Sequence, residues 1–284
     1  MDENLQSILD KCYEAGNLAI LDSFIKTYPK IDAKRSIVCS ISGGSDSDIV
    51  LDILARLDTE KKIHYVFYDT GIEYQATKQH LDYLESKYGI TIDRIKAITP
   101  VPLGCRQYGV PFWSKRVSEM IERLQKHGFK WEDRPFEELI LEYPKCKVAL
   151  MWWCNRWQSS MFNIGRIKYL KEFMVANPPT FRISNKCCNG AKKNNVKMYC
   201  RQLNADLNIF GIRKAEGGAR ASAYKTCFDI GEEWDSYRPI FWYLDKDKEQ
   251  YERIFDVKHS ACYAVYNCGR SHGRTNKSLS FGRQ

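Results

Sequence analysis

The sequence has no CxxC pair, no long apolar run and no secretory start. Its 11 cysteines never stand at the CxxC spacing, which argues against a zinc ribbon. The longest apolar run, residues 148–154, is about a third of the roughly 20 residues that a membrane-spanning helix needs. The N-terminus, MDENLQSILDK, lacks the basic start and apolar block of a signal peptide. We therefore expect a cytoplasmic protein with reduced thiols.

The composition is that of a folded protein with an uneven excess of positive charge. The chain has 284 residues, 44% of them hydrophobic, with 44 Lys+Arg against 35 Asp+Glu and a net charge of +9. This composition excludes disorder and collagen-like repetition. Residues 180–205 and the stretch after Asp256 contain bases and no acid. Phosphate-rich partners, nucleic acid among them, fit this charge, and a solvated basic face is the alternative.

Hydrophobic periodicity predicts an α/β fold. Apolar residues at helical spacing predict an N-terminal helical segment within residues 4–28. Short apolar runs then alternate with amphipathic stretches in a β-α-β-α-β order, which predicts a mostly parallel twisted sheet with helices on both faces. The predicted strands of this part are 36–42, 63–68 and 92–98, and its helices begin near Asp46 and at Tyr74. Later elements are predicted as helices near 114–128 and 166–175, strands at 206–212 and 237–244, and a helix from a capping Asp245 to Phe255.

No linker, repeat or low-complexity tract divides the chain. We therefore predict one compact domain with appendages. The predicted parts are an N-terminal helical segment (1–35), an α/β nucleotide-binding domain (36–244) and a C-terminal helix with a basic, cysteine-containing tail (245–284).

The most informative segment lies between the first predicted strand and the helix that follows. It reads SISGGSDSD from Ser40 to Asp48. Its glycines let the backbone approach a bulky anion, and its hydroxyls and helix-start amides can donate to phosphate. Asp46 is a candidate Mg²⁺ ligand, and a plain helix-capping turn is the alternative. The predicted phosphate-binding residues are Ser40, Ser42, Gly43, Gly44, Ser45, Asp46 and Ser47.

Several elements along the chain resemble those of one family. SGGSDS at 42–47 resembles the SGGxDS loop of the PP-loop ATP pyrophosphatases, which grips the pyrophosphate of ATP. DTGIE at 69–73 and the GIRKAEGGAR segment at 211–220 resemble elements of the phosphoadenosine-phosphosulfate (PAPS) reductase branch, as does RPIFW at 238–242. The chain is thus identified as a member of the PAPS reductase-like family of the PP-loop, or adenine nucleotide alpha-hydrolase-like, superfamily. The further nucleotide-binding residues that the resemblance implies are Asp69, Thr70, Gly71, Glu73, Arg213 and Arg220.

The cysteines resemble parts of the family's iron–sulfur site. CCNGAKK at 187–193 matches the vicinal pair, and HSACY at 259–263 resembles the lead-in to the second half, but the GCxGCPFG that should follow is absent. The resemblance implies a [4Fe–4S] cluster, and buried core thiols are the alternative. NCG at 267–269, with His272 nearby, resembles the ECGxH element that carries the nucleophilic cysteine of PAPS reductases, which here would be Cys268. Arg270 and His272 beside Cys268 would lower its pKa. The implied cluster ligands are Cys187, Cys188, Cys262 and Cys268.

The retained phosphate loop favours ATP as the nucleotide. PAPS reductases carry a modified loop, whereas this chain keeps the full string. The resemblance therefore implies cleavage of ATP between its α- and β-phosphates, followed by sulfur attack on an adenylylated acceptor, as in thiolation and DNA-phosphorothioation enzymes. The alternatives are a sulfonucleotide (PAPS or APS) reductase that uses a C-terminal cysteine and a non-catalytic adenine-nucleotide sensor. The implied partners are an adenine nucleotide and either nucleic acid or a sulfur-donor protein, without a membrane.

The resemblance also assigns roles within the site. Asp46 would organise Mg²⁺, and the cysteines would handle sulfur. The family's usual lysine before this aspartate is Ser45 here, so charge neutralisation would fall to Lys192, Lys193 or Arg213. The predicted catalytic residues are Asp46, Cys187, Cys188 and Cys268.

Overall fold

The computed structural model describes residues 3–157, 162–217 and 223–263. The chain divides into two compact units, one of Met1–Ala97 with Asn194–Arg283 and one that contains Ile98–Lys193. The predicted α/β domain over residues 36–244 includes Ile98–Lys193, which form a compact unit of their own, and the predicted domain limits stay a prediction. Aromatic side chains give this insertion a separate core, and periodicity alone does not reveal that separation.

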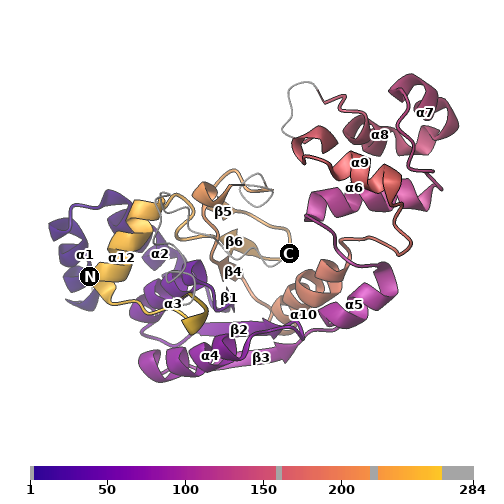
Figure 1. Cartoon of the computed structure of the whole chain (residues 1–284). Helices are drawn as coiled ribbons and strands as arrows, with labels where there is room; N and C mark the ends of the chain where they lie inside the picture. Colours follow the sequence, from indigo (N-terminus) through magenta and orange to yellow (C-terminus); the bar gives the residue numbers. More distant parts are fainter. Residues whose placement is uncertain (1–2, 158–161, 218–222, 264–284) are drawn as a thin grey trace. The chain divides into compact units, whose positions relative to one another are not determined.

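A six-stranded sheet organises the first unit (Figure 1). The strand order is β3-β2-β1-β4-β6-β5, and every neighbouring pair is parallel except β5 with β6. The mostly parallel α/β fold predicted from the sequence is confirmed. The strands are β1 (Ile37–Ile41), β2 (Ile63–Asp69), β3 (Ile92–Lys96), β4 (Leu207–Phe210), β5 (Phe228–Asp229) and β6 (Asp235–Tyr237).

Side-chain alternation along the central strands explains why helices cover both faces. Ile37, Cys39 and Ile41 join the main hydrophobic core, whereas Val38 joins a smaller core that includes Tyr199 of α10. Successive residues of a strand point to opposite faces, so both faces of β1 need cover. The helices of this unit are α1 (Glu3–Glu14), α2 (Leu18–Asp32), α3 (Ser45–Leu57), α4 (Gln75–Tyr88), α10 (Asn194–Gln202) and α12 (Asp245–Phe255), with short 3₁₀ turns η4 (Lys214–Glu216) and η5 (Ala261–Tyr263).

The segment predicted as a strand over 237–244 is different in the structure. Strand β6 ends at Tyr237, and the chain then turns, with Phe241 N–H donating to Arg238 C=O and Tyr243 N–H to Ile240 C=O. Pro239 lacks the N–H that a ladder requires, and the apolar run after it lies in turns. Ile240, Phe241 and Tyr243 are buried there, whereas Trp242 and Leu244 are about half exposed. Helix α12 begins at Asp245 as predicted, but Leu244 is its N-cap and Asp245 is its first residue.

The second unit is helical and has an aromatic core. Trp153 stacks edge-on with Phe129 and Trp131, and its indole N–H donates to Glu132 C=O at 2.9 Å. These rings bury a large area in a small volume, which allows short helices to form a core of their own. The elements are α5 (Val101–Tyr108), α6 (Lys115–Lys126), α7 (Phe136–Glu142), η1 (Pro144–Cys146), α8 (Lys147–Trp153), η2 (Ile164–Arg166), α9 (Leu170–Ala176) and the π-helical η3 (Asn189–Lys193).

The order of the strands fixes where a ligand site belongs. Strand β1 has β2 on one side and β4 on the other. The chain first adds strands β2 and β3 on one side of β1 and later adds β4 on the opposite side, so the direction of strand addition reverses between β1 and β4. Open α/β sheets bind ligands beyond the carboxyl ends of the strands at such a reversal. The loop at 42–44 follows β1, and Gly211 follows β4. Within the described residues, no helix is long and apolar enough to cross a membrane.

Candidate functional site

The loop between β1 and α3 has the geometry of a phosphate cradle. Gly43 has a φ of +65°, and a Cβ there would lie 2.7 Å from Thr77 Cγ2. Gly44, the N-cap of α3, places no side chain over the helix start. The loop is braced from inside, since Ser42 N–H donates to Ser47 Oγ at 3.0 Å. Backbone N–H groups at such a helix start are suited to an anion.

The end of β4 packs directly against the start of α3. A Cβ on Gly211 would lie 2.9 Å from the Asp46 carbonyl oxygen and 3.0 Å from Ser47 N. Only a glycine permits this backbone approach. Gly211 therefore brings the segment that contains Arg213 to the side of the loop.

Asp46 is enclosed by cations. Arg213, only 1% exposed, donates from Nε to both Asp46 carboxylate oxygens at 3.0 and 3.1 Å, and from Nη1 to Asp245 at 2.8 Å. Lys248 Nζ lies 3.0 Å from Asp46 Oδ1. Burial alone would raise the pKa of the Asp46 carboxyl, but a hydrogen bond with Glu216 and the charges of Lys248 and Arg213 outweigh it and hold that pKa well below its usual range.

This pairing bears on the predicted Mg²⁺ role of Asp46. Both carboxylate oxygens already accept hydrogen bonds from Arg213, and one also contacts Lys248. As arranged, Asp46 does not fit a magnesium ligand, because the ion pairs must open first. In the structure Asp46 holds two cations beside the loop, and its Mg²⁺ role stays a prediction.

Two residues from the end of the first unit reach the loop, and the sequence analysis did not assign them to it. Lys248 of α12 donates to Ser45 Oγ, and Ser45 N–H donates to the Tyr263 hydroxyl at 3.0 Å. Each is more than 200 positions from the loop, so local patterns carry no sign of the contact. The one hint in the sequence was a missing residue, because position 45 has a small hydroxyl where the family has a lysine.

The residues predicted at the end of β2 form a tight turn. Asp69 accepts from Gly71 N–H at 2.9 Å and pairs with Lys78 at 3.3 Å, while Thr70 Oγ1 donates to Glu73 at 2.8 Å. The Gly71 amide and the Lys78 ammonium outweigh burial and lower the pKa of Asp69. Because β2 is next to β1, this turn lies at the same edge of the sheet as the loop.

Two further predicted residues stand apart from the phosphate cradle. Ser40 lies within β1, where its hydroxyl donates to Asn208 of the neighbouring strand β4 at 3.2 Å. This contact gives Ser40 a place in the sheet. Arg220 lies outside the described residues.

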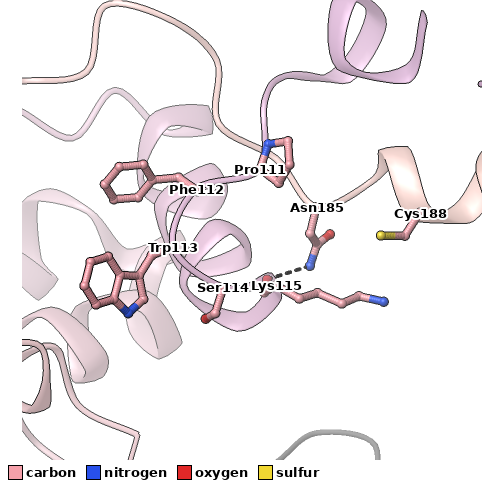
Figure 2. Close-up of a pocket in the computed structure, with 7 residues that line it drawn as sticks. All are labelled: Pro111, Phe112, Trp113, Ser114, Lys115, Asn185 and Cys188. Atoms are coloured by element: carbon pink, nitrogen blue, oxygen red, sulfur yellow. Dashed lines mark hydrogen bonds between the residues drawn. The ribbon is translucent and has the colours of Figure 1, made fainter. Parts of the chain in front are cut away.

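The vicinal cysteines belong to the second unit, together with a third thiol. Burial first, and the neighbouring thiols Cys188 and Cys105 next, raise the pKa of Cys187 to about 12. Burial and the neighbouring thiols thus disfavour the thiolate form of Cys187. Cys188 is half-buried and lines a small pocket with Trp113 and Lys115 (Figure 2), whose remaining lining residues are Pro111, Phe112, Ser114 and Asn185. Of the vicinal pair, Cys188 is the more exposed thiol.

The four predicted cluster ligands lie in different parts of the chain. Cys187 and Cys188 are in the second unit, Cys262 is in the first, and Cys268 lies outside the described residues. No group of three or more His, Cys, Asp or Glu side chains that could hold a metal occurs in the described ranges. The cluster therefore stays a prediction.

A buried ionic network links α3, the helix that follows the loop, to α4 and to the segment after α12. Asp48 is fully buried, and its Oδ2 contacts His80 Nε2 at 3.0 Å and His259 Nδ1 at 2.8 Å. His259 Nε2 also contacts Glu252 at 2.8 Å. Burial alone would lower the pKa of His259, but its hydrogen bonds with the two carboxylates raise it from 6.5 to about 9.

We expect this network to make stability fall between about pH 6.5 and pH 9. In that window the folded state keeps the His259 proton that the unfolded state releases. The contribution of His259 to the free energy of unfolding is therefore complete below pH 6.5 and is lost as the pH rises to about 9. The contribution is about 3 kcal/mol. Urea unfolding of wild type and His259→Gln across this range measures it, and the difference between the two proteins should shrink with rising pH. An equal difference at all pH values would show that His259 folds uncharged.

Comparisons with known proteins point to the same family as the motifs. Residues 36–131 match the family model described as the phosphoadenosine phosphosulfate reductase domain. An uncharacterized protein of Methanocaldococcus jannaschii is 31% identical over 184 residues, which are 62% of this chain and 36% of that protein. The chain thus spans little more than a third of the length of this relative.

Two solved structures resemble the chain in fold alone. The PAPS reductase of Candida auris in a phosphate complex has a TM-score of 0.48 and 10% identity, over 91% of this chain and 90% of that one. The NH₃-dependent NAD synthetase of Campylobacter jejuni in complex with nitrate has a TM-score of 0.41 and 12% identity, over 96% of this chain and 80% of that one. Residues 36–131 therefore carry a match to the PAPS reductase domain, in agreement with the resemblance of the motifs to PP-loop proteins.

Proposed function

We propose that this chain binds ATP and cleaves it between the α- and β-phosphates to activate an acceptor for sulfur transfer. The observation that carries the proposal is the complete SGGSDS loop at the reversal of strand order, with Gly43 in the left-handed conformation and Gly44, which has no side chain, as the N-cap of α3. A pyrophosphate group presents the oxygens that such a cradle binds.

The chemistry would proceed in two displacements. An acceptor oxygen attacks the α-phosphorus, the bond to the bridging oxygen breaks, and pyrophosphate leaves with the electron pair. A sulfur nucleophile then attacks the adenylylated acceptor carbon or phosphorus, and AMP leaves. The loop residues 42–47 hold the pyrophosphate in line, and Arg213 and Lys248 offset its charge. Mg²⁺ would arrive with the nucleotide and shield the same phosphates.

Sulfur handling is the second part of the proposal. Cys188 is favoured over Cys187 as the sulfur carrier, because the latter is buried and its pKa is about 12. A sulfur-donor protein that carries a persulfide would pass its outer sulfur to the Cys188 thiolate and leave as a thiol. The outer sulfur on Cys188 would then attack the adenylylated acceptor, and a thiol reductant would attack the Cys188 sulfur of the resulting disulfide and release the thiolated acceptor. Nucleic acid is the acceptor class that the basic stretches favour.

One observation favours a second function. The family model that matches residues 36–131 is described by sulfonucleotide reduction. In that function the nucleotide would be PAPS or APS, and the nucleophile would be Cys268, which lies outside the described residues. A non-catalytic nucleotide sensor is the third outcome that an experiment must separate.

Product analysis tests the proposal. ATP labelled separately at the α- and γ-phosphates is incubated with the protein, a persulfide donor, a thiol reductant and either DNA or RNA. We expect AMP and pyrophosphate, and we expect Cys188→Ala to stop sulfur incorporation while Cys154→Ala, a half-buried thiol of the same unit, leaves it unchanged. ADP and phosphate would refute the cleavage position, and nucleotide binding without products would identify a sensor. Unchanged sulfur incorporation in Cys188→Ala would remove its role.

A further inference from the structure

Lys248 is placed in an unusual way for a lysine. It lies on α12, is only 9% exposed, and directs its ammonium inward to the phosphate loop. Lysines on helices usually extend their ammonium groups to water, because a buried ammonium loses its hydration. Here the ammonium is compensated by Ser45 Oγ and by Asp46 Oδ1 at 3.0 Å. The fold therefore holds a positive charge at the loop and offsets the desolvation of that charge with polar partners.

The residue that Lys248 contacts is the one where this loop departs from its family. Resembling loops carry a lysine before the aspartate, and this chain has Ser45. The short hydroxyl of Ser45 leaves room for the Lys248 ammonium, whereas a lysine at position 45 would bring a second positive charge to the same place. Positions 45 and 248 are thus complementary. The site has one ammonium group, and α12 supplies it in place of the loop.

The charge around the two cations differs. Arg213 is held by two carboxylates, Asp46 and Asp245, at 2.8–3.1 Å. Lys248 contacts one carboxylate and one neutral hydroxyl among the described residues. An ammonium carries three N–H donors, so a phosphate oxygen can join or replace Asp46 without breaking a second ion pair. Lys248 is therefore the cation that is better able to move its charge to a ligand.

We propose that Lys248 binds the β- and γ-phosphates of ATP and replaces in space the lysine that the loop lacks. The assignment rests on the proposed function, since it needs ATP in the loop. It predicts selectivity by phosphate content: Lys248 contributes to ATP binding and not to AMP binding, because AMP has no phosphate beyond the α position. None of the three cations considered from sequence was this residue.

Calorimetric titration of variants with Mg–ATP and with AMP tests the assignment. Lys248→Met should weaken ATP at least about tenfold and change AMP by less than about twofold, because a charge-assisted phosphate contact is lost. Lys248→Arg, which keeps the charge, should retain most of the ATP affinity. Lys246→Met, an exposed neighbour on α12, is the matched control and should bind both nucleotides as wild type does. Thermal unfolding of each variant confirms that it is folded.

A lysine exchange makes the test stricter. Ser45→Lys alone should weaken ATP by crowding two ammonium groups, and Ser45→Lys combined with Lys248→Ser should restore it by returning the charge to the loop. The assignment is overturned if Lys248→Met binds ATP like wild type, or if it loses ATP and AMP equally. If wild-type protein binds no ATP at all, the proposed function fails and the assignment fails with it. If wild-type protein binds ATP, a failure in the variants counts against Lys248 alone.

Discussion

Replacing Asp52 by alanine should lower the free energy of unfolding by about 3–5 kcal/mol. Asp52 is fully buried on α3, the helix that begins with the phosphate loop. Its oxygens accept from Arg56 at 2.7 and 3.0 Å, and from the hydroxyls of Tyr88 and Tyr251, each at 2.6 Å. Removal of the carboxylate leaves a partly buried guanidinium and two hydroxyls without their acceptor, and buried donors without partners are costly.

An exposed ion pair provides the control for this prediction. Asp22 pairs with Lys26 one helical turn away, and both side chains are about half exposed. Asp22→Ala should change stability by less than about 1 kcal/mol, because water replaces the lost contact. Urea unfolding monitored by tryptophan fluorescence measures both variants. An Asp52→Ala loss as small as that of Asp22→Ala would mean that the buried network does not hold α3 in place.

Gly211→Ala should damage the nucleotide site more than it damages the fold. The added methyl group would lie 2.9–3.0 Å from backbone atoms of Asp46 and Ser47, which cannot move aside as a side chain can. Overpacking of this kind costs about 1–3 kcal/mol and displaces the neighbouring backbone. Because that backbone is the start of α3, we expect ATP affinity to fall at least about tenfold as the loop amides lose their alignment.

Gly89→Ala separates this effect from a general loss of stability. Gly89 has a φ of +61°, and no atom lies within 4 Å of the place that an added methyl group would take. Alanine there adds backbone strain of about 1–2 kcal/mol without touching the loop. Both variants should unfold at lower urea, but only Gly211→Ala should lose ATP affinity. Equal ATP binding by the two variants would contradict the close packing of β4 on α3.

The part of the fold that the sequence could predict is the part with strong local periodicity. Strands β1, β2 and β3 and helices α3 and α4 lie within two residues of the predicted limits, because apolar alternation and helical spacing are local properties. The run at 237–244 misled the prediction because burial in turns and burial in a strand select the same apolar residues. The separate unit of Ile98–Lys193 escaped it because a hydrophobic pattern does not state which core a side chain joins.

The residues of the candidate site also divide into those that local sequence predicts and those that it does not. Gly43, Gly44 and their hydroxyl neighbours could be predicted as a phosphate loop because such a loop is continuous in the chain. Lys248 and Tyr263 were not found, because their contacts with Ser45 arise only when α12 and η5 return to the loop. The Mg²⁺ role given to Asp46 likewise overlooked Lys248, which closes the carboxylate together with Arg213.

The most direct test of the account is calorimetric titration of the wild-type protein with Mg–ATP, AMP and PAPS at one salt concentration. The central claim is that the loop at 42–47 binds the pyrophosphate part of ATP. The account predicts that ATP binds at least about tenfold more tightly than AMP and more tightly than PAPS, because only ATP presents β- and γ-phosphates to the cradle. Tight binding of PAPS together with weak or absent binding of ATP would contradict it and make sulfonucleotide reduction the function to pursue.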